Sequence, residues 1–148
     1  MPLIHLFLAA VAAFTLLSIN GCSQDSGPTL AAPDAFAQAQ AGQLTLVDIR
    51  RPDEWEQTGV AKDALQINMA HPQGDAGFVA QLAAETGGDK NARIGLICRT
   101  GNRTTQMQRV LQQAGFTQVY NIKEGMAGSG AGPGWIARGL PLEACARC

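Results

Sequence analysis

The sequence predicts an α/β fold with a mainly parallel central sheet that is covered by helices on both faces. Segments that have the composition of buried strands alternate with segments of helical periodicity along the chain. The clearest strands, 44–49 and 93–98, are apolar almost throughout, which is typical of parallel strands buried on both sides. A length of 148 residues with 46% hydrophobic residues fits one small domain.

Each element has its own signal in the sequence. Pro33 and Asp34 begin the first helix and Gly42 ends it, Phe78 and Leu82 repeat at helical spacing, and Gly115 closes the last helix. The expected elements are a helix over 33–42, a strand over 44–49, a turn or short helix over 51–59, a weak strand over 65–68, a polar loop over 71–75, a helix over 77–88, a strand over 93–98, a helix over 103–116 and a strand over 118–122. Ligands of such folds bind at the carboxyl ends of the strands.

Residues 1–21 are expected to be an export signal and not part of the fold. The uncharged apolar run 6–19 is too short for a comfortable membrane span. The Gly21-Cys22 that follows resembles the lipobox of bacterial lipoproteins, in which Cys22 becomes a lipid-modified N-terminus; cleavage elsewhere and an uncleaved anchor are the alternatives. Residues 22–32 would then be a linker. The expected location is the periplasm, with a lipid anchor in the bacterial outer membrane.

The overall charge excludes some classes of partner. The formal net charge of −1 gives no attraction to nucleic acid or to anionic lipid. Phosphate-binding, dinucleotide-binding and nucleic-acid-binding signatures are missing from the sequence. We therefore expect no nucleic-acid partner, no metal and no organic cofactor.

Cys98 ends the best strand and is followed directly by a polar, cationic loop that leads into a helix. Backbone N–H groups of such a loop, together with the helix dipole, form an anion-binding cradle. Arg99 and Arg103 add positive charge, and Gly101 permits a tight turn. A strand-end cysteine is more often inert and buried. In this setting, however, we expect Cys98 to be a nucleophilic thiolate.

Three motifs carry a resemblance to a known family: 48-DIRRPDE-54 followed by Trp55, 98-CRTGNR-103 followed by Thr104, and 124-EG-125 with Trp135 and 139-GLPLE-143. They occur in the order typical of single-domain rhodanese-like sulfurtransferases, which the chain resembles over residues 33–144. The resemblance implies the three-layer rhodanese-like fold. In 59-GVAKDA-64, Val60 and Asp63 replace a histidine and a glycine that are usual in the family. The glycine-rich segment 125–134 is interpreted as a surface loop in preference to a flap.

The resemblance also implies a ping-pong reaction. Cys98 takes the outer sulfur of an anionic donor such as thiosulfate, forms a persulfide, and passes the sulfur to cyanide, a small thiol or a protein thiol. The residues expected to bind the donor are Arg99, Thr100, Gly101, Asn102, Arg103 and Thr104. Asp48, Arg50 and Glu54 are expected to support the structure, and Arg103 to pair with a carboxylate such as Glu54.

Two other functions stay open at this point. A phosphatase or arsenate reductase would use a similar cradle, but those enzymes need a C-x5-R loop, one residue longer than the C-x4-R loop here. A persulfide carrier or binding module without enzymatic activity would deliver sulfur to a protein partner.

The chain ends in 145-CARC-148, which is a C-x-x-C pair. In an oxidising periplasm, Cys145 and Cys148 most simply form a local disulfide and leave Cys98 free. A mobile tail that resolves the Cys98 persulfide is one alternative. Metal capture is another, although two thiolates make an incomplete zinc site.

Overall fold

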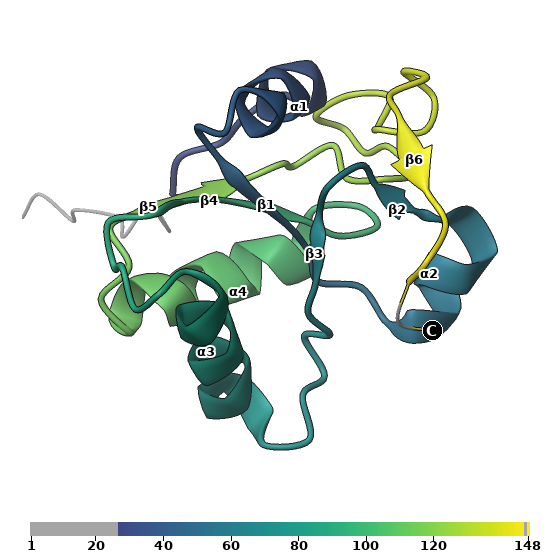
Figure 1. Cartoon of the computed structure of the whole chain (residues 1–148). Helices are drawn as coiled ribbons and strands as arrows, with labels where there is room; N and C mark the ends of the chain where they lie inside the picture. Colours follow the sequence, from purple (N-terminus) through teal and green to yellow (C-terminus); the bar gives the residue numbers. More distant parts are fainter. Residues whose placement is uncertain (1–26, 147) are drawn as a thin grey trace, which may run out of the picture.

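The computed structural model describes residues 27–146 and 148, so the predicted signal and Cys22 lie outside the described part of the chain. Its centre is a parallel four-stranded sheet with the strand order β3-β1-β4-β5 (Figure 1). The strands are β1 (Thr45–Asp48), β3 (Leu65–Gln66), β4 (Arg93–Ile97) and β5 (Gln118–Asn121). The helices are α1 (Ala32–Gln40), α2 (Pro52–Thr58), α3 (Gly74–Glu85) and α4 (Asn102–Gln113).

Helices cover both faces of the sheet. On one face, Phe78 of α3 and Met107 of α4 pack in a buried cluster with Val47 of β1. On the other face, Ala35 of α1 packs in a second cluster with Leu46, the neighbour of Val47 on β1. Side chains alternate between the two faces of a strand, so β1 is buried on both sides. The predicted three-layer α/β fold is confirmed.

The register of the sheet brings the functional segments to one edge. Asp48 on β1 lies opposite both Gln66 on β3 and Ile97 on β4. Because these strands are parallel, the loops that follow Asp48 and Ile97 leave the sheet side by side. The loops after β1 and β4 therefore form the carboxyl edge.

A second, small sheet was not predicted from the sequence. It pairs β2 (Val60–Ala61) with β6 (Leu142–Glu143) in antiparallel orientation, with Val60 opposite Glu143. Strands of two residues are too short for a periodic pattern to reveal them. The pairing joins the C-terminal segment to the chain just after α2.

Other boundaries differ from the expected ones by a few residues. Residues 74–75, expected in a polar loop, belong to α3, and the weak strand is confined to Leu65–Gln66. In the glycine-rich segment, residues 129–131 are exposed while Gly125 and Met126 are buried. Its tip is a surface loop, and its base is part of the packed structure.

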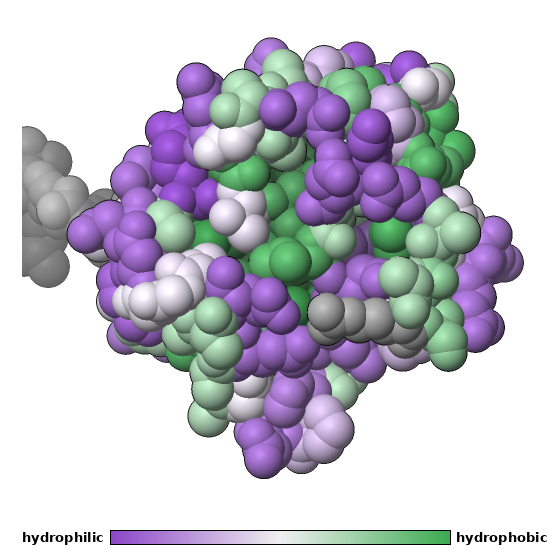
Figure 2. Space-filling model, viewed as in Figure 1, coloured by the Kyte–Doolittle hydropathy of each residue, from purple (hydrophilic) through white to green (hydrophobic). Residues whose placement is uncertain are grey.

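The face seen in Figure 2 has hydrophobic residues gathered in the middle, over β1 and β3, with hydrophilic residues around them. This agrees with the place of β3 at the end of the sheet, where Leu65 is only partly covered. Within residues 27–146, none of the helices is both long enough and apolar enough to cross a membrane.

Candidate active site

Cys98 lies immediately after β4 and is buried, with 1% of its surface exposed. It is the free cysteine among those described. The amide N–H of Gly101 donates a hydrogen bond to the Cys98 Sγ at 3.2 Å, and the Thr104 Oγ1 lies 3.5 Å from the same sulfur. Gly101 is the N-cap of α4 and has a φ of 87°, a left-handed conformation that favours glycine. The loop thus turns an amide donor and the helix N-terminus toward the sulfur.

A neighbouring segment fixes the shape of this loop. The amide of Met126 donates to the Cys98 carbonyl at 2.8 Å, and the amide of Ala127 donates to the Arg99 carbonyl at 2.9 Å. The loop and the segment after β5 approach so closely that a Cβ on Gly101 would collide with the Lys123 carbonyl. The base of the glycine-rich segment therefore binds the carbonyl groups of Cys98 and Arg99 and fixes the backbone of the loop.

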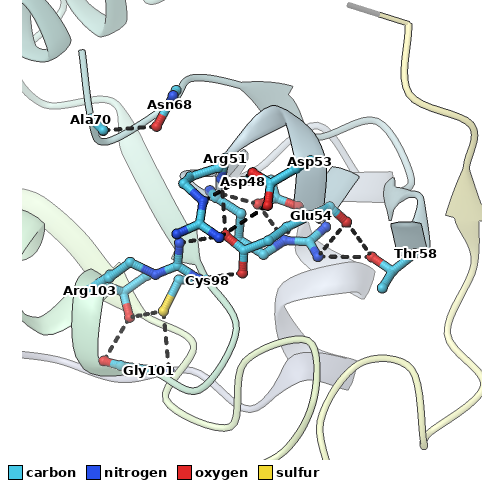
Figure 3. Close-up of polar contacts among 12 residues, drawn as sticks. Asp48, Arg51, Asp53, Glu54, Thr58, Asn68, Ala70, Cys98, Gly101 and Arg103 are labelled. Atoms are coloured by element: carbon cyan, nitrogen blue, oxygen red, sulfur yellow. Dashed lines mark hydrogen bonds and ion pairs between the residues drawn. The ribbon is translucent and has the colours of Figure 1, made fainter. Parts of the chain in front are cut away.

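Arg103 connects the loop to α2. Its guanidinium donates two hydrogen bonds to the Glu54 carboxylate, at 2.6 and 2.7 Å (Figure 3). The hydrogen bond from Arg103 holds the pKa of Glu54 below its ordinary value although burial opposes this, so Glu54 is ionised. Glu54 in turn raises the pKa of Arg103, and the nearby Cys98 contributes to the increase. The guanidinium therefore lies within electrostatic reach of the sulfur as well as the carboxylate.

Asp48 and Arg50 form a buried ion pair behind this bridge. Their side chains are 0% and 2% exposed, and the Arg50 Nη2 lies 2.7 Å from the Asp48 Oδ2. The Arg50 Nε also donates to both carboxylate oxygens, at 2.9 and 3.0 Å. The Asp48 Oδ1 accepts a further hydrogen bond from the Arg50 amide at 3.1 Å.

The remaining donors of Arg50 hold α2. The Nη1 donates to the Thr58 Oγ1 at 2.8 Å and to the Glu54 carbonyl at 3.3 Å, and the Nη2 donates to the Gly59 carbonyl at 2.8 Å. All five N–H groups of the guanidinium are thereby used. Arg50 fixes α2 against the end of β1, and α2 carries Glu54 to Arg103.

Glu124 anchors the segment that braces the loop. It is 3% exposed and accepts hydrogen bonds from the amides of Ala32 and Gly134, at 2.7 and 3.0 Å, and from the Arg138 Nε at 2.6 Å. Burial raises the pKa of Glu124, but the hydrogen bonds from Arg138, Ala32 and Gly134 outweigh it and lower the pKa below its ordinary value. Glu124 is therefore a buried carboxylate with three donors.

Three pockets border the loop. A pocket of about 330 Å³ is lined by Thr100, Gly101 and Asn102 of the loop and by Thr105, Lys123, Ser129, Gly130 and Ala131. The other two pockets reach the arginines at the ends of the loop. One has a volume of about 310 Å³ and is lined by Arg50, Glu54, Gln57, Thr58, Arg99, Met126, Ala127 and Ile136. The other has a volume of about 260 Å³ and is lined by Ile49, Arg51, Asn68, Met69, Ala70 and Arg103. The exposed Arg99, which follows the buried Cys98 in the sequence, brings a cation to the pocket of about 310 Å³.

The residues proposed from the sequence fall into two groups in space. The loop 98–104 and its supports Asp48, Arg50 and Glu54 meet at the carboxyl edge, whereas Cys145 and Cys148 lie on the C-terminal tail and are joined by a disulfide. Sequence reasoning missed the amides of Met126 and Ala127, because backbone contacts leave no residue-type signal. Among the described residues, no group of three or more His, Cys, Asp or Glu side chains is arranged to hold a metal ion.

Comparison with known proteins adds the family. The fold and the site define a parallel α/β protein with a buried cysteine in an amide-braced loop. Residues 32–130, well over half of the chain, match the model of the rhodanese-like domain. The chain belongs to this family.

Named relatives agree with this assignment. The chain is 32% identical over 106 residues to a sulfurtransferase of Allochromatium vinosum, covering 72% of this chain and 84% of that protein. A polysulfide-sulfur transferase homodimer of Wolinella succinogenes has a similar structure, with a TM-score of 0.61, 25% identity and 82% of each chain covered. A thiosulfate sulfurtransferase of Pseudomonas aeruginosa also has a TM-score of 0.61 and 25% identity, over 78% of this chain and 20% of that one. Together these findings support sulfurtransferase activity in general.

Glu124 gives a prediction about stability and pH. Because the folded state lowers its pKa, its contribution is fully present above the unfolded value of about 4.3 and is lost as the pH falls through the folded value. We expect Glu124→Gln to lower the free energy of unfolding by about 1–3 kcal/mol at neutral pH, since Arg138 loses a charged partner. The difference in unfolding free energy between the variant and the wild type should become smaller at acidic pH. Urea unfolding at a series of pH values measures this difference.

The matched control for this experiment is Glu56→Gln, which makes the same change at an exposed position of α2. It should stay within about 0.5 kcal/mol of wild type. If Glu124→Gln lowered the free energy of unfolding by the same amount at every pH, this would contradict the conclusion that Glu124 is an ionised carboxylate with a lowered pKa.

Proposed function

We propose that this chain is a sulfurtransferase in which Cys98 carries sulfane sulfur, as a persulfide, from an anionic donor to a thiol or cyanide acceptor. The observation that carries the proposal is the free Cys98 with the Gly101 amide on its sulfur, inside a six-residue C-x4-R loop. Family membership and the sulfurtransferase relatives support the general activity. The donor and the persulfide step are our own inference.

The reaction has two displacements at sulfur. In the first, the Cys98 thiolate attacks the outer sulfur of thiosulfate; the new S–S bond forms, the S–S bond of thiosulfate breaks, and sulfite leaves with the electron pair. In the second, the acceptor attacks the outer sulfur of the persulfide and the Cys98 thiolate leaves. The thiolate and the persulfide are both anions. The hydrogen bond from the Gly101 amide and the positive charge of Arg103 therefore stabilise both forms of Cys98.

We place the anionic end of the donor in the pocket lined by Arg99. Arg50 also lines that pocket, but its guanidinium N–H groups are already used by Asp48, by α2 and by Gly59. Arg99 therefore supplies the available charge for a sulfonate or polysulfide. Polysulfide is a second candidate donor, because the Wolinella succinogenes relative is named a polysulfide-sulfur transferase.

The expected signal sequence and Cys22 give the cellular setting of the proposal. Export with lipid attachment at Cys22 would hold the domain at the outer membrane of a bacterium, with 23–32 as a short tether. The donor and the acceptor would then both be periplasmic.

The test of the nucleophile is intact-mass measurement before and after thiosulfate, and again after cyanide. The wild-type chain should gain the mass of one sulfur and lose it with cyanide, while Cys98→Ser should gain none. The double variant Cys145→Ser with Cys148→Ser is the control and should still gain and lose the sulfur. Transfer that persists in Cys98→Ser would refute the mechanism. A stable adduct that cyanide does not remove would favour a persulfide carrier over an enzyme.

Arg99 is tested by steady-state kinetics. If it binds the donor equally in the ground and transition states, Arg99→Ala should raise the KM for thiosulfate about tenfold with kcat changed less than about twofold. Arg109→Ala removes an exposed arginine of α4 that lines neither the pocket with Arg99 nor the pocket with Arg103, and it should leave KM unchanged. Equal KM values for wild type and Arg99→Ala would remove Arg99 from the donor site.

The lipid anchor is tested on the chain recovered from a Gram-negative host. Intact mass of the membrane fraction should correspond to a chain that starts at Cys22 and carries acyl groups, and Cys22→Ser should release the protein into the soluble fraction. A soluble wild-type product cleaved at another residue would rule out the anchor.

A further inference from the structure

The C-terminal tail carries a disulfide at a fixed place on the molecule. Cys145 and Cys148 are joined, with their Cα atoms 5.8 Å apart. The pairing of β6 with β2 holds the chain as far as Glu143, and the tail then runs beside α2 (Figure 1). Cys145 is half-buried and Cys148 is exposed. The disulfide is therefore open to solvent on the Cys148 side.

The two sulfurs have different polar neighbours. The Gln66 side chain, from the end of β3, donates an N–H hydrogen bond to the Cys145 Sγ at 2.9 Å. The Cys148 Sγ lies 3.4 Å from the carbonyl oxygen of Pro52, at the start of α2. A donor beside a sulfur stabilises its thiolate, whereas a carbonyl oxygen favours the neutral S–H group, which can donate to it. These neighbours favour Cys145 as the leaving group when the disulfide is opened.

We propose that the Cys145 and Cys148 pair is a second, redox-active site that exchanges with small thiols or exposed protein thiols, with Cys148 as the attacked sulfur and Cys145 as the leaving group. The exchange is independent of sulfur transfer at Cys98 and does not rest on the proposed function. Its direction follows from exposure, which favours attack at Cys148, and from the Gln66 donor, which favours departure of Cys145.

The chemistry balances in two steps with an external thiol as the reductant. A thiolate RS⁻ attacks the Cys148 sulfur, the bond between the two protein sulfurs breaks, and Cys145 leaves as a thiolate while R–S–S–Cys148 forms. A second thiolate then attacks the sulfur of R, forming R–S–S–R, and Cys148 leaves as a thiolate that takes a proton from water. Two external thiols are oxidised to one disulfide, and the protein pair is reduced to two thiols.

The surroundings connect this site to the active-site region. Pro52, beside Cys148, follows Arg51, and Gln66, beside Cys145, precedes Asn68 by two residues. Arg51 and Asn68 both line the smallest of the three pockets that border the loop, which extends to Arg103 of the Cys98 loop. A thiol-bearing partner that docks at the tail would therefore sit next to a pocket of about 260 Å³ on the same edge of the molecule.

The experiment uses the full-length chain with Cys98→Ser, exposed to reduced glutathione in the millimolar range, quenched with acid and alkylated. Digestion after Glu143 gives the peptide 144–148, in which tandem mass spectrometry locates each modification. We expect the pair to open, with glutathione found on Cys148 and the alkyl group on Cys145. After full reduction, brief alkylation at mildly acidic pH should label Cys145 at least about fivefold more than Cys148.

Gln66→Leu removes the donor beside Cys145 and should slow opening about threefold to tenfold, because the leaving thiolate loses its hydrogen bond. Gln66→Glu keeps the size of the side chain and should also slow opening, since its charge opposes the thiolate. Gln43→Leu makes the matched change at an exposed position before β1 and should open at the wild-type rate.

Three results would overturn the proposal. The first is a disulfide that stays closed in millimolar glutathione, which would make the pair a structural staple. The second is the reverse placement of glutathione and label on the two cysteines. The third is equal opening rates for Gln66→Leu, Gln66→Glu and Gln43→Leu.

Discussion

The buried ion pair of Asp48 and Arg50 is the interaction on which the arrangement of the carboxyl edge of the sheet depends. Removing two charges from water costs several kcal/mol for each ion, and the cost is offset only where every hydrogen-bonding group finds a partner. Here all five guanidinium N–H groups are used. Three of the acceptors belong to α2 or the residue after it, so the same contacts that make the pair tolerable also orient that helix. The pair is therefore a positioning device more than a source of stability.

The Cys98 loop is held from two sides, by α2 and by the segment after Glu124, and each set of contacts acts as a brace. From one side α2 presents Glu54 to Arg103, and from the other the segment after Glu124 supplies amides to the carbonyls of Cys98 and Arg99. Each brace contains a buried or half-buried carboxylate whose charge is maintained by arginine. The loop is fixed at both ends by groups that belong to the surrounding fold, and Cys98 itself packs in the core cluster that contains Val47 and Met107.

Much of the fold was predictable because its strands and helices have strong local signals. Buried apolar strands, helix-ending glycines and the loop after Cys98 all appear as residue patterns. The small sheet of β2 and β6 was missed, since it joins segments about eighty residues apart and each strand has two residues. The same limit applies to the amides of Met126 and Ala127, which brace the loop through the backbone.

Asp63 stands where the family usually has a glycine, and it keeps a backbone conformation that favours glycine. Its φ is 61°, and its carboxylate accepts a hydrogen bond from the Gln40 side chain.

The burial of Cys98 has a consequence for the chemical lifetime of the protein. A thiolate that is open to solvent is oxidised stepwise to sulfenic, sulfinic and sulfonic acids, and the later steps are irreversible. With 1% of its surface exposed, Cys98 is screened from solvent, and this burial restricts a dissolved oxidant and a sulfur donor alike. The exposed sulfur of the tail, by contrast, is already in the disulfide state, which can be restored after reduction. The one free cysteine of the described residues is therefore buried, whereas the exposed Cys148 is held in a disulfide.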